Sequence, residues 1–317
     1  MKVKNTNSIF FSKFSLVFRI ILFMLILTII TSVLAFSIVA PISKDLRKDI
    51  TKVGIGYKVV NYVGSSLTGE GYAEARADLL DAIRQIDDVM GNWSGEVIGS
   101  IVVLIFIMLI FAILYFMAYY TIADILHHFM SSNSKYGFAA NYIANMKTSF
   151  QFSLLYTLYV IAMYVIGFAF AILMGLLIGK IHAILGLFIM FALAIATLAC
   201  RRALVAFWMP AMVSKGLSVT DAFAKNIESL KGKFWRFFCE YYVLYTLAIA
   251  AFIVFSIVTF GVAVLIVYSA AWLYMQIKDM VEYYHLNGMK YYVDEQKVIN
   301  PNKIYRDAIL DEENFTL

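Results

Sequence analysis

The stretch RRALVAFWMPAMVSKGLSVTDAFAKNIESLKGKFWRFF, from Arg201 to Phe238, separates two strongly apolar parts of the chain. It carries seven of the protein's 26 Lys and Arg residues against two acids, Asp221 and Glu228. A basic, partly amphipathic segment between apolar blocks is typical of a loop on the cytoplasmic side of a membrane. We therefore expect this segment, the basic bridge, to face the cytoplasm and to set the orientation of the rest.

The composition also indicates a membrane protein. The chain is 62% hydrophobic and 15% charged, with a mean hydropathy of +0.80, whereas a soluble domain carries about 25% charged residues. The net charge of +5 arises from basic residues that lie between apolar blocks, so it does not indicate a nucleic-acid partner. We expect membrane lipids as partners, and other membrane proteins or self-association as further ones.

The apolar blocks predict an all-α integral membrane protein with about six transmembrane helices, because about 20 apolar residues cross a bilayer. Residues 1–40 form an N-terminal tail and the first, retained span, and residues 97–282 form a five-helix bundle. Inside the bundle, one of the last two segments is alternatively a helix that enters the membrane without crossing. The expected spans are Ile20–Ala40, Val97–Ile122, Phe152–Ile178, Ala183–Cys200 and two within Tyr241–Met275, joined at Thr259–Gly261.

Lys and Arg counted near the span ends place both termini in the cytoplasm, including the tail 283–317. We expect a bacterial-type cytoplasmic membrane. Residues 41–96 are then the larger extracytoplasmic segment, with seven basic and nine acidic residues. Within it, Tyr72–Met90 has the spacing of an amphipathic helix, whereas Val53–Leu67 is left open between strand and loop.

Two four-residue matches indicate an internal repeat of 97–178 in 183–259. Phe138–Asn141 precedes Leu155–Leu158, and Phe223–Asn226 precedes Leu244–Leu247 at a similar distance. Both copies predict a span entering the cytoplasm, a short amphipathic surface helix and a returning span. Chance similarity is the alternative, because the matches are short.

Small residues predict where the third span packs. Side chains four residues apart lie on one face of a helix, and small ones allow two membrane helices to approach closely. We expect Ala192 and Ala196 of the fourth span as partners. The small residues are Gly167, Ala171, Gly175 and Gly179.

Within the basic bridge, Pro210 should end the helix that continues from the fourth span. Ser218 followed by Asp221 is a helix-start pattern, and Gly232 suits a helix end. Arg236 is four residues from Glu240. Basic and aromatic side chains of the bridge are expected to contact lipid headgroups: Arg201, Arg202, Lys225, Lys231, Lys233, Trp235 and Arg236.

The order Met209-Pro210, Lys215-Gly216, Val219-x-x-Ala222-Phe223 and Gly232-Lys233-Phe234-Trp235 resembles a group of bacterial multi-pass proteins. This group contains the membrane domain of glycerophosphoryl diester phosphodiesterases and the YciC-like and Yip1-like proteins. The resemblance covers about residues 200–275. The catalytic domain of the phosphodiesterases has no counterpart here, so the resemblance carries over no catalytic residue.

Two polar sets at expected cytoplasmic helix ends suggest one candidate metal site. Each set has carboxylates and imidazoles at helical spacing, and the two would form a site for zinc or a similar ion if these helix ends adjoin. Helix ends at a membrane surface are polar in any case, so this is the weaker interpretation. The sets are Asp124, His127 and His128, and Asp279, Glu282 and His285.

The sequence lacks a Walker-type glycine loop, a Gly-x-Ser-x-Gly elbow and a His-Glu-x-x-His motif. We therefore predict a protein that is not an enzyme and has no cofactor, with a structural or accessory role in membrane organisation or in lipid or protein traffic. Ionisable residues deep in the apolar blocks are scarce, which disfavours the alternative, a transporter of a small solute or lipid. A water-accessible cavity lined by polar side chains at mid-depth in the bundle would favour transport, and a dry, close-packed interior would favour a scaffold.

Overall fold

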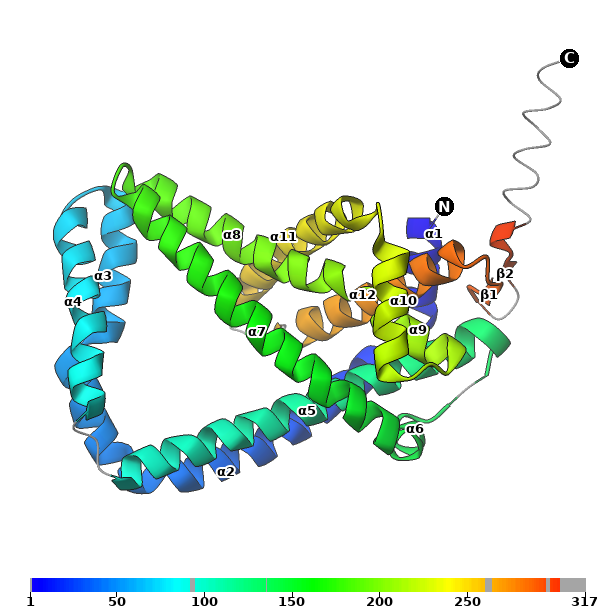
Figure 1. Cartoon of the computed structure of the whole chain (residues 1–317), viewed down its shortest axis with the longest axis horizontal. Helices are drawn as coiled ribbons and strands as arrows, with labels where there is room; N and C mark the ends of the chain where they lie inside the picture. The colour runs from blue at the N-terminus through cyan, green and yellow to red at the C-terminus, as the bar shows by residue number, and fades with distance from the viewer. Residues whose placement is uncertain (1, 92–94, 135, 260–263, 295–296, 303–317) are drawn as a thin grey trace, which may run out of the picture. The chain divides into compact units, whose positions relative to one another are not determined.

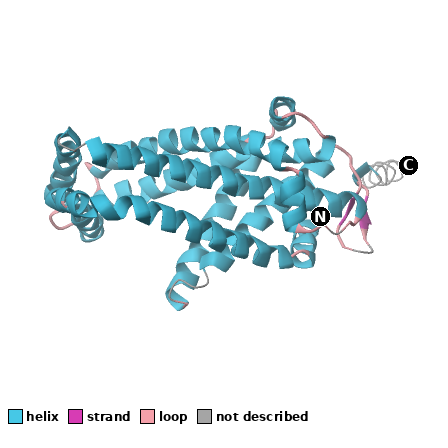
Figure 2. Cartoon of the chain, turned by 90° about the horizontal axis from the view of Figure 1, so that it is seen from below, coloured by secondary structure: helices cyan, strands magenta, loops and turns pink. Residues whose placement is uncertain are grey.

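The computed structural model describes residues 2–91, 95–134, 136–259, 264–294 and 297–302, with side chains left out at 41–53, 55, 86–91 and 96. The chain is almost entirely helical, with one short antiparallel strand pair (Figure 2). Figure 1 labels the elements along the chain. Part of the expected turn at Thr259–Gly261 and the end of the C-terminal tail lie outside the described residues.

Among the described residues, five segments are long and apolar enough to cross a membrane. Many of their apolar side chains are exposed on the surface of the protein. For example, the exposed fractions of Ile105, Ile166 and Ile257 are 63%, 69% and 74%. So much exposed apolar surface requires a hydrocarbon solvent, which makes the chain an all-α integral membrane protein. The segments are Ser15–Ala40 in α2 (Ser15–Val53), Val97–Ser132 in α5 (Gly95–Ser132), α7 (Met146–Gly179), Ala183–Lys215 across α8 (Ala183–Leu204) and α9 (Trp208–Lys215), and α11 (Phe234–Val258).

The sixth expected span corresponds to α12 (Val264–Leu286), which is a continuous helix but is not among these five. Its second half is enclosed by protein: nearly every side chain from Trp272 to His285 is buried. This half also contains Lys278, Asp279 and Glu282. A helix that is surrounded by protein can carry charged groups that lipid would not tolerate.

The chain forms two compact units. Unit 1 contains Met1–Leu25, Ile113–Thr157 and Ala199–Leu317, and unit 2 contains Ile26–Ala112 and Leu158–Leu198. In unit 1, α1 (Lys2–Ser12) and α11 both pack on α12, and α9 packs on α10 (Val219–Leu230). Unit 1 also contains α6 (Phe138–Ala144) and the hairpin of β1 (Tyr291–Tyr292) and β2 (Val298–Ile299).

The basic bridge contains a helix break that one side chain stabilises. α8 ends at Leu204 and α9 begins at Trp208, so Pro210 lies in the first turn of α9, where backbone N–H groups have no acceptor in the helix. The Asn226 side chain accepts a hydrogen bond from Phe207 N (2.9 Å) and donates one to Leu204 O (2.8 Å). Its amide thus replaces the backbone hydrogen bonds that the break removes.

The predicted ends of the bridge helix α10 are confirmed. Ser218 Oγ accepts from Asp221 N at 3.2 Å and donates to the Asp221 carboxylate at 2.6 Å. After α10 ends at Leu230, Gly232 has a φ of 74°, the left-handed conformation typical of a residue that follows a helix.

In unit 2, α3 (Ile55–Thr68) and α4 (Tyr72–Gly91) pack against each other. The predicted helix at Tyr72–Met90 is therefore confirmed, and most of Val53–Leu67, which the sequence left open, is helical. The small buried side chains of Ala75 and Ala82 allow α4 to approach its neighbours closely. The hydroxyls of Tyr62 and Tyr72 lie 3.3 Å apart, and burial with this hydrogen bond raises the pKa of Tyr62 to about 12.

The glycines of α7 face the following helix, α8. A Cβ at Gly175 would lie 2.6 Å from Met190 Cβ, and a Cβ at Gly167 would overlap Thr197. A Cβ at Gly186 would lie 2.6 Å from both Gly175 O and Gly179 N. These glycines therefore meet Gly186, Met190 and Thr197 on α8, not the expected Ala192 and Ala196. A Cβ at Gly179 would also overlap Tyr72. Ala171, the fourth small residue, is buried.

We expect Gly186→Ala to lower the thermal unfolding midpoint of the purified protein in detergent. The new methyl group would overlap backbone atoms of α7, and such overpacking costs about 1–3 kcal/mol. Gly99→Ala is the matched control, because a Cβ there meets no atom within 4 Å and alanine favours a helix over glycine. Equal destabilisation by both substitutions would contradict the close approach of α7 and α8.

Candidate functional site

Three side chains from three helices meet in the interior of unit 1. A guanidinium nitrogen of Arg202, at the end of α8, donates to one carboxylate oxygen of Asp279 on α12. The hydroxyl of Tyr241 on α11 donates to the other oxygen. Arg202, Asp279 and Tyr241 are 3%, 2% and 0% exposed, so both oxygens of a buried carboxylate are satisfied by protein.

Aromatic rings enclose this ion pair. The Arg202 guanidinium lies 5.2 Å from the centre of the Tyr119 ring on α5, within the range of a cation–π contact. Tyr119 stacks on Trp272 of α12 and on Tyr156 of α7, at centroid distances of 5.7 and 5.8 Å. The Gln276 side chain also donates to Tyr119 O at 2.9 Å. The rings keep water from the ion pair and join α5 and α7 to it.

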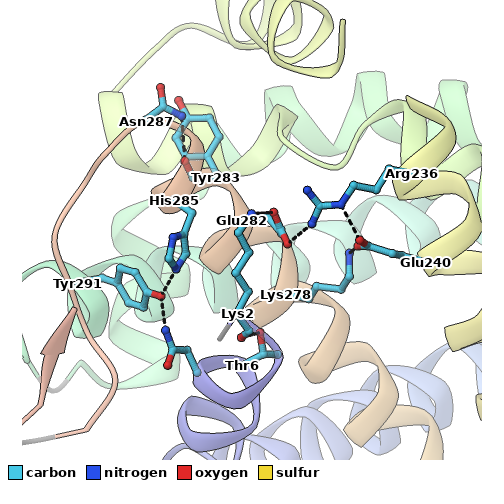
Figure 3. A network of polar contacts seen from close by, with 11 residues as sticks. Lys2, Thr6, Arg236, Glu240, Lys278, Glu282, Tyr283, His285, Asn287 and Tyr291 are labelled. Atoms are coloured by element: carbon cyan, nitrogen blue, oxygen red, sulfur yellow. Dashed lines mark hydrogen bonds and ion pairs between the residues drawn. The ribbon is translucent and has the colours of Figure 1, made fainter. Parts of the chain in front are cut away.

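A chain of ion pairs also joins α1, α11 and α12 (Figure 3). Glu282 accepts from Lys2 Nζ at 2.6 Å and from Arg236 Nη2 at 3.0 Å. Arg236 Nε also lies 2.8 Å from Glu240, which in turn lies 2.8 Å from Lys278 Nζ. Positive and negative groups therefore alternate across α1, α11 and α12. The two groups together, called the charged cluster below, are Lys2, Arg202, Arg236, Glu240, Lys278, Asp279 and Glu282.

Helical spacing accounts for part of the charged cluster. Arg236 and Glu240 are four residues apart on α11, so both lie on one face of the helix. Tyr241 follows Glu240 directly and reaches Asp279 on α12 from an adjacent face. Arg202 lies in the last turn of α8, where a cation also interacts favourably with the helix dipole.

His285 and Tyr291 connect α12 to α1 near the start of the hairpin (Figure 3). His285 Nε2 lies 2.7 Å from the Tyr291 hydroxyl, which accepts from Asn5 Nδ2 at 2.7 Å. Burial raises the pKa of Tyr291 to about 12. Its hydroxyl therefore stays protonated at neutral pH and can donate a hydrogen bond to His285.

The two sets considered as a metal site do not converge. Among the described residues, no three His, Cys, Asp or Glu side chains come close enough to hold one ion. The ends of α5 and α12 do adjoin, but through His127 Nδ1 and the Tyr284 hydroxyl at 2.6 Å. Asp124 accepts from Asn145 and lies 3.6 Å from His128 Nδ1. Asp279, Glu282 and His285 have the protein partners described above, so the described residues do not bring the two sets of the candidate metal site together.

The residues expected to contact headgroups divide into two groups. Arg201 and Arg202 are buried, at 8% and 3% exposure, and Arg201 donates to the Tyr245 hydroxyl at 3.3 Å. Their expected lipid contact is corrected to contacts within the protein, since few of their atoms reach the surface. Arg236 is exposed but bonds to two carboxylates. Trp235 is 73% exposed, Lys231 is exposed, and Lys225 and Lys233 are partly exposed.

The partners of Asp279 could not be found from the sequence, although Arg202, Asp279 and Glu282 were each singled out. Arg202 and Asp279 are separated by 77 positions, and their pairing follows from the packing of α8 and α12. The sequence did indicate that Asp279 and Glu282 need partners, because carboxylates in a membrane helix are costly unless they are paired. Only the pair Arg236 and Glu240, four residues apart, was evident from spacing.

Comparison of the chain with family models, with curated proteins and with solved structures finds no match. The fold itself therefore defines the class: an all-α integral membrane protein with several apolar helices. The resemblance to the phosphodiesterase membrane domain group stays a prediction.

We expect Asp279→Asn to destabilise the protein by about 3–5 kcal/mol, because it leaves the buried guanidinium of Arg202 without a counter-ion. The combination of Arg202→Met with Asp279→Leu removes both charges and should recover most of that loss. Thermal unfolding in detergent and the yield of monodisperse protein measure both effects.

Lys225→Gln serves as the control for this experiment, since Lys225 pairs with Glu228 at the surface and exposed pairs contribute little. An Asp279→Asn protein as stable as the wild type would show that the buried ion pair does not hold the helices together.

Proposed function

We propose that the chain is a non-enzymatic structural or accessory protein of a bacterial cytoplasmic membrane, which organises a membrane complex or affects lipid or protein traffic. The observation that carries this proposal is the charged cluster. Asp279 and Glu282 each have both carboxylate oxygens engaged by protein donors. Because these bonds join α1, α8, α11 and α12, the cluster is suited to hold one arrangement of the helices.

Coupled transport makes a different demand on such residues. A coupling carboxylate has to exchange its partner for an ion, a proton or water during the cycle. Asp279 is 2% exposed and packed beside the stacked rings of Tyr119 and Trp272. This close packing favours the structural role over the alternative.

A transporter is nevertheless the second candidate, and the same residues are the observation in its favour. Arg202 and Asp279 are ionisable and buried within a membrane protein, and residues of this kind often mark an ion or substrate path. In a transporter the two charges themselves would be needed for function, whereas in a scaffold an apolar pair of similar volume would replace them.

The proposed orientation rests on the distribution of Lys and Arg, with the basic bridge and both termini in the cytoplasm. We expect a cysteine introduced by Lys231→Cys, with both native cysteines replaced by alanine, to react with an impermeant maleimide only after the cells are permeabilised. Lys180→Cys, in the turn between α7 and α8, should react in intact cells. Lys231 and Lys180 are both exposed, so the reverse pattern would contradict the orientation.

The structural role is tested by crosslinking intact cells, purifying the chain in mild detergent and identifying bound proteins and lipids by mass spectrometry. We expect a stoichiometric membrane protein or a second copy of the chain to accompany both the wild type and the variant that combines Arg202→Met with Asp279→Leu. A wild-type chain that purifies without any stoichiometric protein would contradict the accessory role. Loss of the companion from a stable double variant would show that the charges do more than hold the helices.

A further inference from the structure

A cavity of about 550 Å³ opens in unit 1, away from the charged cluster. Its walls come from the junction of α1 and α2, from the last turns of α5, from the loop after α5 and from Asp294 beside the hairpin. Its volume is within the range of small-molecule sites. The polar side chains that line it, apart from Asp294, are Ser12, Lys13, Ser15, Arg19, Ser134 and Tyr136.

The cavity lies next to the ends of two helices that are long and apolar enough to cross a membrane. The apolar segment of α2 begins at Ser15, and that of α5 ends at Ser132. Residues next to both of these ends line the cavity. The ends of membrane spans lie at the level of the lipid headgroups, so the cavity opens at that level.

The lining of the cavity includes both apolar and basic side chains. Leu16, Leu126 and Phe129 are buried apolar members of it, at 3%, 0% and 1% exposure. Lys13 Nζ lies 3.6 Å from the centre of the Phe129 ring. Arg19 is exposed on α2, one turn after Ser15. The lining thus combines buried apolar side chains with two cations and several hydroxyls.

One carboxylate is also present in the lining, and it opposes the binding of an anion. Asp294 Oδ1 accepts a hydrogen bond from Lys297 N at 2.7 Å, so one of its two oxygens is used by the hairpin. Two basic side chains against one acid leave the lining with an excess of positive charge.

We propose that this cavity binds the phosphate-bearing headgroup of an anionic membrane lipid. A guanidinium matches the geometry of a phosphate, and an ammonium and hydroxyls donate to its remaining oxygens. The acyl chains would extend along the exposed apolar surface where α2 enters the membrane, for example past Phe18 and Leu22, which are 62% and 60% exposed. The site is separate from the charged cluster and does not depend on whether the protein is a scaffold or a transporter.

The test uses the full chain, purified in dodecyl maltoside and stripped of lipid. Phosphatidylglycerol, phosphatidylcholine and inorganic phosphate are added separately, and binding is followed by native mass spectrometry and by the thermal unfolding midpoint. We expect phosphatidylglycerol to bind and to raise the midpoint, with a much smaller effect of phosphatidylcholine. Inorganic phosphate alone should have little effect, because it makes no contact with the apolar surface.

Arg19→Gln should weaken the binding of phosphatidylglycerol about fivefold, which corresponds to about 1 kcal/mol for one basic group near an anionic lipid. Addition of Lys13→Gln should weaken it further. Lys4→Gln is the matched control, because it removes one exposed charge that does not line the cavity. If the double variant does not fold, Arg19→Gln alone gives the answer, since Arg19 is exposed.

Three results would overturn the proposal. Equal binding of phosphatidylglycerol and phosphatidylcholine would remove the role of the anionic headgroup. An equal loss of affinity with Lys4→Gln would show general attraction by surface charge. Full saturation of the site by inorganic phosphate, with no further effect of the lipid, would assign the site to free phosphate.

Discussion

The buried carboxylate of Asp279 is the constraint on which the rest of unit 1 depends. Transfer of a single charge from water into a protein interior costs several kcal/mol, and mutual attraction offsets this only with good geometry and complete hydrogen bonding. Arg202 and Tyr241 meet that condition from two different helices. The contact of α12 with α11 and with Arg202 in the last turn of α8 is therefore a requirement of Asp279 and not only a result of apolar packing.

The charged cluster also explains why the N-terminal residues are part of the fold. They were expected as a tail before the first span, yet α1 is a helix that packs on α12. Lys2 pairs with Glu282 at 2.6 Å, and Asn5 bonds to Tyr291 at 2.7 Å. Residues from the N-terminal helix and from the C-terminal part of the chain thus satisfy each other's polar groups, which favours one arrangement of both.

Unit 2 is held by a different interaction. In lipid, apolar side chains give little drive for association, so membrane helices depend on close contact between backbones. Gly175 and Gly186 provide such contact between α7 and α8. The two units thus show two solutions to the same problem: paired charges within protein, and small residues between helices that face lipid.

The sequence by itself determined the features that depend on neighbouring residues. These are the membrane class, the existence of the long apolar helices, the start of α10 at Ser218 and its end before Gly232, and the pair Arg236 and Glu240. Each follows from composition, from a helical spacing or from a local backbone preference, and none requires knowledge of the fold.

Only the tertiary structure decided which residues far apart in the chain meet. It paired Arg202 with Asp279 and placed Asn226 at the break between α8 and α9. It also placed His127 against Tyr284, and Asp124 against Asn145 and His128, without bringing the two candidate metal-binding sets together. It also identified Gly186, Met190 and Thr197 as the residues opposite the glycines of α7. A residue pattern indicates that a charge or a small side chain lies on a given face of a helix. The packing of the whole chain decides which other helix covers that face.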